Sequence, residues 1–202
     1  IASLEKGRTQ YTANAGLATL KNEIATYMKR RFNLSYDGPS QVLVTVGGSE
    51  AIDLCIRSLV SPGDEVIVPV PSFVCYGPIV SLAGGVPVYA ELKAEDQFRL
   101  TADTLKACIT EKTKMLILPF PNNPTGAVMR KEDLEEIAEV LRDTDIAVLS
   151  DEIYAELTYG DVRHVSIAEI DGMFVAIGLI PQNEIFTGTI DLDDYGYVNA
   201  NE

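Results

Sequence analysis

Short apolar runs and helical stripes alternate along most of this chain. Each run is bounded by turn residues, which predicts the buried strands of a parallel sheet. The runs are Val42–Val46, Val66–Val70, Val86–Ala90, Met115–Pro119 and Ile146–Leu149. Since strands alternate with helical segments up to Leu149, the pattern predicts an α/β fold with three layers, in which helices flank a mostly parallel sheet.

The helical segments are recognised by apolar residues at i, i+3, i+4 and i+7. Leu134, Ile137, Ala138 and Leu141 form such a stripe, which predicts one helix face packed on the sheet. Further helices are expected over 17–28, 49–59 and 101–110, the last with Thr101 as its N-cap. The sequence Asp-Gly-Pro at 37–39 predicts a turn.

Two strand ends carry residues suited to ligand binding. Gly47, Gly48 and Ser49 lie between a strand and a helix, where free backbone N–H groups can receive an anion, although such a turn often only ends a strand. Asp151 and Tyr154 follow the last strand, at the edge where open α/β sheets place ligands. Alternatively, Asp151 caps a helix that begins at Glu152.

Four motifs in this order resemble the fold-type-I pyridoxal-phosphate-dependent aminotransferases of class I/II. They are V-T-V-G-G-S-E-A at 44–51, P-G-D-E-V at 62–66, P-N-N-P-T-G at 121–126 and S-D-E-I-Y at 150–154. The resemblance covers about residues 9–171 and implies the large domain of such an enzyme. It also implies transfer of an amino group from an amino acid to a 2-oxo acid, with pyridoxal 5′-phosphate as cofactor.

The resemblance also implies which residues contact the cofactor. Gly47, Gly48 and Ser49 would hold its phosphate, and Phe73 would stack on the pyridine ring. Asp151 would keep the ring nitrogen protonated, so that the ring can accept electrons. Asn123, beside a cis bond to Pro124, and Tyr154 would contact the ring hydroxyl, and Tyr11 would reach the phosphate of a dimer partner. Without the resemblance, Phe73 could equally be an ordinary core residue, and Tyr11 would be interpreted as an exposed tyrosine.

One essential residue of the family has no counterpart. The lysine that forms a Schiff base with the cofactor lies well after S-D-E-I-Y, whereas the last of the eight lysines here is Lys131. We therefore expect a truncated form without catalytic residues, inactive and binding the cofactor noncovalently at best. The alternatives are a non-catalytic module for pyridoxal phosphate, another phosphate or assembly, and a flavoprotein reductase fragment, which the missing G-x-G-x-x-G disfavours.

The residues after Arg163 form a separate compositional zone, because no Lys or Arg follows it. The segment F-V-A-I-G-L-I-P at 174–181 resembles thioredoxin reductases, so we expect a chimera of an aminotransferase portion, 1–171, and a foreign tail, 172–202. The apolar run Phe174–Ile180 would supply the next strand, and Thr189–Leu192 would pair with Tyr197–Asn199 as a hairpin.

Composition narrows the class of protein further. A net charge of −14 and a pI near 4.4 disfavour binding to nucleic acid and anionic membranes. Three scattered cysteines read as small buried hydrophobes of a reduced protein, and without a leader or spanning run we expect a cytoplasmic protein. The family resemblance, in turn, implies a possible homodimer. The single histidine, His164, reads as a surface residue, and no metal site is expected.

Overall fold

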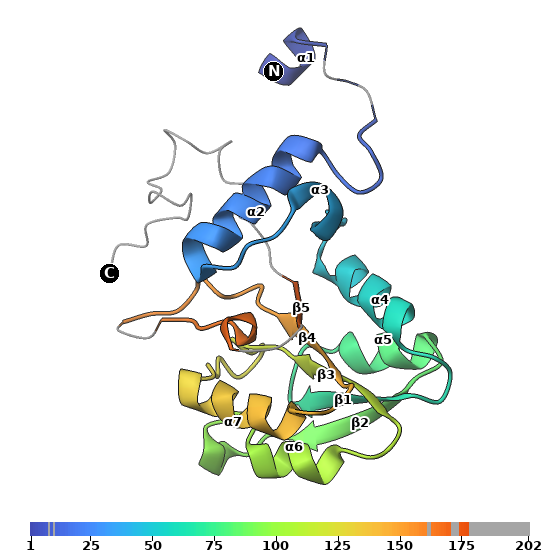
Figure 1. The fold of residues 1–202 in the computed structure, drawn as a ribbon, viewed down its shortest axis with the longest axis vertical. Helices are drawn as coiled ribbons and strands as arrows, with labels where there is room; N and C mark the ends of the chain where they lie inside the picture. Colours follow the sequence, from blue (N-terminus) through green and yellow to red (C-terminus); the bar gives the residue numbers. More distant parts are fainter. Residues whose placement is uncertain (8, 10, 161–162, 171–173, 178–202) are drawn as a thin grey trace.

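A computed structural model of the chain describes residues 1–7, 9, 11–160, 163–170 and 174–177 (Figure 1). Its strands are β1 (Glu65–Val70), β2 (Val86–Glu91), β3 (Thr113–Leu118), β4 (Ala147–Asp151) and β5 (Phe174–Ile177). Its α-helices are α1 (Ala2–Glu5), α2 (Ala18–Phe32), α3 (Gly38–Gln41), α4 (Gly48–Leu59), α5 (Tyr76–Leu82), α6 (Ala102–Cys108) and α7 (Lys131–Leu141). Two 3-10 turns, η1 (Ala94–Asp96) and η2 (Ile167–Glu169), complete the described elements.

The strands form one sheet in the order β2-β1-β3-β4-β5, and every neighbouring pair is parallel. The chain runs outward from β1 to β2 and then returns past β1 to β3. The strand order therefore reverses between β1 and β3. In an open α/β sheet, such a reversal leaves a crevice at the carboxyl ends of the two strands, and ligands bind there.

Alternating side chains of the central strands divide the core into two parts. Leu116 and Val148 pack into the part that also contains residues of α6 and α7. Ile117 and Leu149, one position further along, pack into the part that contains residues of α4 and α5. Because successive strand residues point to opposite faces, one apolar run serves both helix layers, which confirms the predicted three-layer architecture (Figure 1).

Most predicted helix positions are confirmed. Thr101 is the N-cap of α6, and its hydroxyl accepts a hydrogen bond of 3.2 Å from the backbone N–H of Thr104. Lys29, Arg30 and Arg31 lie in the last turn of α2, where positive side chains complement the helix dipole.

Two local predictions are wrong. Val42–Val46 is not a strand, since no neighbouring strand lies alongside it within the described residues. Its Val44 N–H instead donates to the carbonyl of Ala15 at 3.2 Å. A pattern of apolar residues favours an extended backbone but cannot supply the hydrogen-bonded partner that a sheet requires. The expected turn at Asp37 is the start of α3, in which the Asp37 carboxylate accepts from the Ser40 N–H.

The apolar run after residue 173 begins as a strand. Phe174–Ile177 forms β5 and pairs in parallel with β4, with Phe174 opposite Val148 and Ile177 opposite Asp151. Residues 178–180 and the predicted hairpin of 189–192 with 197–199 lie outside the described residues.

The three cysteines are free thiols and half-buried, so the prediction that they are buried hydrophobes holds only in part. Cys75 and Cys108 lie at helix ends, where packing is less complete than in the centre of the core. Within the part of the chain that the structure describes, no helix combines the length and apolarity needed to cross a membrane.

Candidate functional site

The candidate site begins at the N-terminus of α4. Gly47 is the N-cap residue and has a φ of +88°, a conformation that strains residues other than glycine. A Cβ added to Gly47 or Gly48 would meet nothing within 4 Å, so the backbone faces open space there, and the Ser49 side chain is exposed. Unpaired N–H groups of a first helical turn attract anions, so this opening suits a phosphate group.

An aromatic pair follows the carboxyl end of β1. Phe73 is 40% exposed, so the core interpretation of this residue is wrong. Its ring meets that of Tyr76 edge to face, with centroids 6.0 Å apart and planes at 82°. The Phe73 ring can therefore stack on a flat ligand while its contact with the Tyr76 ring keeps it in place.

Asp151 is the last residue of β4 and is only 7% exposed. Its Oδ2 accepts a hydrogen bond of 2.9 Å from the Tyr76 hydroxyl, and its Oδ1 accepts one of 3.3 Å from the backbone N–H of Ile153. Burial raises the pKa of this carboxyl, the two hydrogen bonds lower it, and the neighbouring Glu152 raises it. The helix-cap interpretation is wrong, because residues 153–156 form a turn and no helix begins at Glu152.

Two residues of this cluster, Tyr76 and Cys75, were not predicted from the sequence. Burial, followed by the negative charge of Asp151, raises the pKa of the Tyr76 hydroxyl. The Cys75 thiol interacts with the Ser49 side chain, and its pKa is raised by burial and then by Asp151. The sequence could have indicated Tyr76, because it lies three positions after Phe73 at the junction of a strand and a helix, where side chains at this spacing can lie next to each other.

The two asparagines of P-N-N-P-T-G have different roles. Asn122 is buried and shapes the loop, since its Oδ1 accepts from the Thr125 hydroxyl at 3.0 Å and its backbone carbonyl accepts from the Gly126 N–H at 2.8 Å. Asn123 is exposed, and its Nδ2 lies 3.5 Å from the Tyr154 hydroxyl. The cis peptide bond at Asn123–Pro124 is confirmed. Asn123 and Tyr154 thus form the predicted pair that can address one ligand group.

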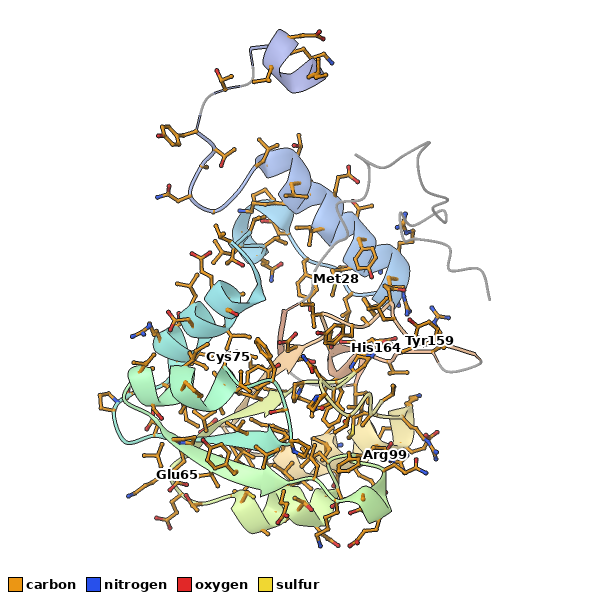
Figure 2. The ribbon with its side chains drawn as sticks, turned by 180° about the vertical axis from the view of Figure 1, so that it is seen from behind. Met28, Glu65, Cys75, Arg99, Tyr159 and His164 are labelled. Carbon is orange, nitrogen blue, oxygen red and sulfur yellow. The ribbon has the colours of Figure 1, made fainter. Side chains whose placement is uncertain are left out.

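These contacts connect most of the predicted residues. Ser49 meets Cys75, Phe73 meets Tyr76, Tyr76 meets Asp151, and Tyr154 lies close enough to Tyr76 to affect its titration. Figure 2 shows Cys75 beside α4 and α5. The set offers donors for a phosphate, an exposed aromatic ring and a carboxylate, which fits a phosphorylated pyridine.

Tyr11 is not brought into the cluster. Its side chain is fully exposed, at 105%, on the segment before α2. None of the contacts that connect the other predicted residues involves it. Its predicted role across a dimer interface stays a prediction.

The prediction that His164 lies on the surface is wrong. Its side chain is 5% exposed, and its Nε2 lies 2.9 Å from Oε2 of Glu152 (Figure 2). A lone histidine in a sequence carries no sign of a buried acidic partner, because the partner is found only when the chain folds. Among the described residues, no three His, Cys, Asp or Glu side chains gather as a metal site would require.

An open hollow of about 1060 Å³ adjoins the Asn123–Tyr154 pair, both of which line it. Four basic side chains also line this hollow, and no acidic residue is among its described lining. They are Arg99, Arg130, Lys131 and Arg163. Arg99 and Lys131 pair with acidic residues outside the lining, at 3.3 and 3.6 Å, so their charges are partly offset.

Comparison with known proteins places this geometry in a family. The sequence profile of the family described as aminotransferase class I and II matches residues 2–187, and so continues past the seam expected at 171–173. YugH of Bacillus subtilis (strain 168), provisionally named an aminotransferase, is 53% identical over 173 residues, which are 86% of this chain and 45% of that protein. The aspartate aminotransferase of Pyrococcus abyssi is 45% identical over 172 residues, which are 85% of this chain and 44% of that protein.

Solved structures of aminotransferases have the same fold as this chain. The aromatic aminotransferase from Pyrococcus horikoshii OT3 superimposes with a TM-score of 0.87 and 40% sequence identity, over 93% of this chain and 51% of that one. This chain spans about half the length of the relatives it matches. From the profile match, the sequence identities and the shared parallel sheet, we conclude that the chain belongs to the class I and II aminotransferases.

Proposed function

We propose that this chain carries the cofactor-binding part of a pyridoxal-phosphate-dependent aminotransferase. The observation that supports it most directly is the position of Asp151, buried at the end of β4 and bonded to Tyr76, next to an exposed Phe73 ring. The whole protein would transfer an amino group between an amino acid and a 2-oxo acid. The cofactor, when bound, supplies the electron-accepting ring for this reaction.

The residues of this chain would each act on a separate part of the cofactor. The N-terminal turn of α4, from Gly47 to Ser49, would bind the phosphate. Phe73 would cover one face of the ring and exclude water from it. Asp151 would hold a proton at the ring nitrogen. Because Asp151 is buried, its carboxylate would be stabilised by a hydrogen bond to that protonated nitrogen. Asn123 and Tyr154 would orient the ring through its hydroxyl.

The basic hollow offers a route for the substrates. Amino acids and 2-oxo acids carry carboxylates, and four basic side chains line the same hollow as Asn123 and Tyr154. A cleft lined by one sign of charge concentrates ligands of the other sign. We infer that substrates enter there, which matters in a chain whose net charge of −14 would otherwise repel them.

A titration with pyridoxamine 5′-phosphate tests the cofactor assignment without a lysine. This amine has no aldehyde, so it binds only through noncovalent contacts. We expect saturable binding of one molecule per chain, weakened about tenfold, or about 1.4 kcal/mol, by Asp151→Asn. The matched control is Asp53→Asn, a partly exposed carboxylate on α4 that pairs with Arg57. Absence of saturable binding to the unmodified chain would contradict the proposal.

Catalysis by this chain alone would require one of its eight lysines to form a Schiff base with the cofactor. The alternative function is a non-catalytic module that binds the cofactor or another phosphate, favoured because no lysine follows Lys131. Adding pyridoxal 5′-phosphate, reducing with borohydride and mapping the peptides separates the two. One lysine labelled stoichiometrically supports catalysis, and scattered or absent labelling supports the silent module.

We also propose the oligomeric state, the location of the protein and a join near residue 172. A homodimer would bring Tyr11 to the partner's phosphate, a cytoplasmic location would suit the reduced thiols, and a join near residue 172 would explain the thioredoxin-reductase-like segment. Reading the source DNA across codons 165–180 tests the join, because a continuous open reading frame there would show that the join belongs to the gene, and a break there would show that it does not.

A further inference from the structure

A buried polar cluster lies beside Asp151 and is not used by the proposed cofactor contacts. It consists of Ser150, Glu152, His164 and Ser166, each at most 7% exposed. The carboxylate of Glu152 is its centre. Oε1 accepts from the hydroxyls of Ser150 at 2.8 Å and Ser166 at 2.7 Å, while Oε2 accepts from Nε2 of His164 at 2.9 Å.

A buried carboxylate is unfavourable unless hydrogen bonds satisfy it, and here three donors do so. The donors come from separate segments, since Ser150 belongs to β4 while His164 and Ser166 belong to the loop before η2. Ser166 is itself fixed as the N-cap of η2 by bonds to Ala168 and Glu169. The cluster therefore ties the end of β4 to this loop.

The end of α2 holds the imidazole from its other side. The Phe32 ring meets the His164 ring edge to face, with centroids 6.1 Å apart and planes at 89°. Phe32 is itself 5% exposed, so this contact is part of the packed interior. His164 thus has a fixed ring orientation, which sets the direction of its bond to Glu152.

Strand geometry connects this cluster to Asp151. Successive side chains along a strand point to opposite faces, so Ser150 and Glu152 point away from the face that Asp151 uses. Asp151 accordingly meets Tyr76 on the α5 side, while Glu152 meets His164 on the other side. Because the two residues are adjacent in the chain, a shift of the backbone at Glu152 also moves the backbone that carries the Asp151 carboxylate.

We propose that Glu152 and His164 are positioning residues that fix the position of the Asp151 carboxylate. If the proposed function holds, they thereby also fix its hydrogen bond to the pyridine nitrogen. Loss of the His164 donor leaves one oxygen of a buried carboxylate without its partner. Glu152 then turns toward other donors or water, and the backbone from Asp151 to Ile153 moves with it. The contact between Tyr76 and Asp151 loosens as a result.

The matched pair His164→Phe and His164→Gln tests this. Phenylalanine keeps an aromatic ring against Phe32 but removes the donor, whereas glutamine can place an amide N–H near the Nε2 position. Ile137→Val, in the buried core on α7, is the control for a general loss of stability. Should His164→Phe fail to fold, Ser166→Ala removes a different donor from the same carboxylate.

Cys75 provides a readout that needs no cofactor. The negative charge of Asp151 contributes to the raised pKa of its thiol, so the pH profile of Cys75 alkylation reports where that carboxylate lies. We expect the profile of His164→Phe to move to lower pH, and those of His164→Gln and Ile137→Val to match the unmodified chain. Peptide mapping separates Cys75 from Cys55 and Cys108. An unchanged profile in both His164→Phe and Ser166→Ala overturns the proposal.

Binding of pyridoxamine 5′-phosphate supplies the second readout. We expect about a tenfold loss of affinity in His164→Phe and recovery in His164→Gln. If the Cys75 profile moves but the unmodified chain binds no cofactor, the positioning of Asp151 stands and the proposed function fails. If the chain binds the cofactor and neither His164→Phe nor Ser166→Ala changes either readout, the positioning role fails while the proposed function stands.

Discussion

The hydroxyl of Tyr76 donates a hydrogen bond of 2.9 Å to Oδ2 of Asp151, although 75 positions of sequence separate the two residues. This bond joins the start of α5 to the end of β4 at the carboxyl edge of the sheet. It compensates in part for burying a charged group, and it fixes the direction in which the carboxylate faces a ligand.

Tyr76→Phe is expected to lower the free energy of unfolding by about 1.5–3 kcal/mol at pH 7, the usual value of a hydrogen bond to a charged group. The loss should shrink at low pH, where Asp151 is protonated and needs the donor less. Urea denaturation at pH 7 and pH 4 measures both values. An equal loss at both pH values would show that Asp151 is not the relevant partner.

Asp151→Asn is expected to stabilise the chain near neutral pH while impairing cofactor binding. Because the folded-state pKa of Asp151 is raised, the folded chain holds the proton more tightly than the unfolded chain does. Its contribution to stability is therefore present below the unfolded pKa and is lost as pH rises through the folded pKa. Removing the buried charge should raise Tm by about 2–4 °C at pH 8, or roughly 1 kcal/mol.

The control for that experiment is the same comparison at pH 3.5. There the carboxyl is protonated in the folded state, and the gain from Asp151→Asn should be small. A gain that does not depend on pH would mean that the substitution acts through packing and not through charge.

Gly47→Ala is expected to reduce binding of the cofactor phosphate and to destabilise the start of α4. A residue with a Cβ at a φ of +88° is strained, which costs about 1–2 kcal/mol. Denaturation measures that cost. Comparing pyridoxamine 5′-phosphate with pyridoxamine isolates the phosphate, since the substitution should weaken only the phosphorylated ligand. Equal weakening of both would place the effect at the ring.

Cys75 is expected to react slowly with iodoacetamide at pH 7, because burial and Asp151 raise the pKa of its thiol. Bound pyridoxamine 5′-phosphate should slow the reaction further by covering the site. Cys108, on α6 with a pKa raised by burial alone, is the internal control and should show no protection. Mass spectrometry of alkylated peptides gives the rate at each thiol. Equal protection of both would indicate global stabilisation.

Local patterns were sufficient for much of the fold. The runs at 66–70, 86–90, 115–119 and 146–149 became β1 to β4, since short buried strands and amphipathic helices are set by the order of apolar and polar residues. The prediction of a strand at Val42–Val46 failed because a strand also needs a hydrogen-bonded partner strand, and none lies beside this segment in the part of the chain that the structure describes. The motifs around Gly47, Asn123 and Asp151 were recognisable because each is contiguous.

By itself, then, the sequence determined the family, the alternation of strands and helices, and the residue types that suit a phosphorylated pyridine. Only the tertiary structure decided that Tyr76 donates to Asp151, that Phe73 is exposed, and that His164 is buried against Glu152. The physical reason is that exposure depends on what the folded chain packs around a side chain, and that the two contacts join separate segments of the chain. Their partners depend on strand order and register, which no local pattern specifies.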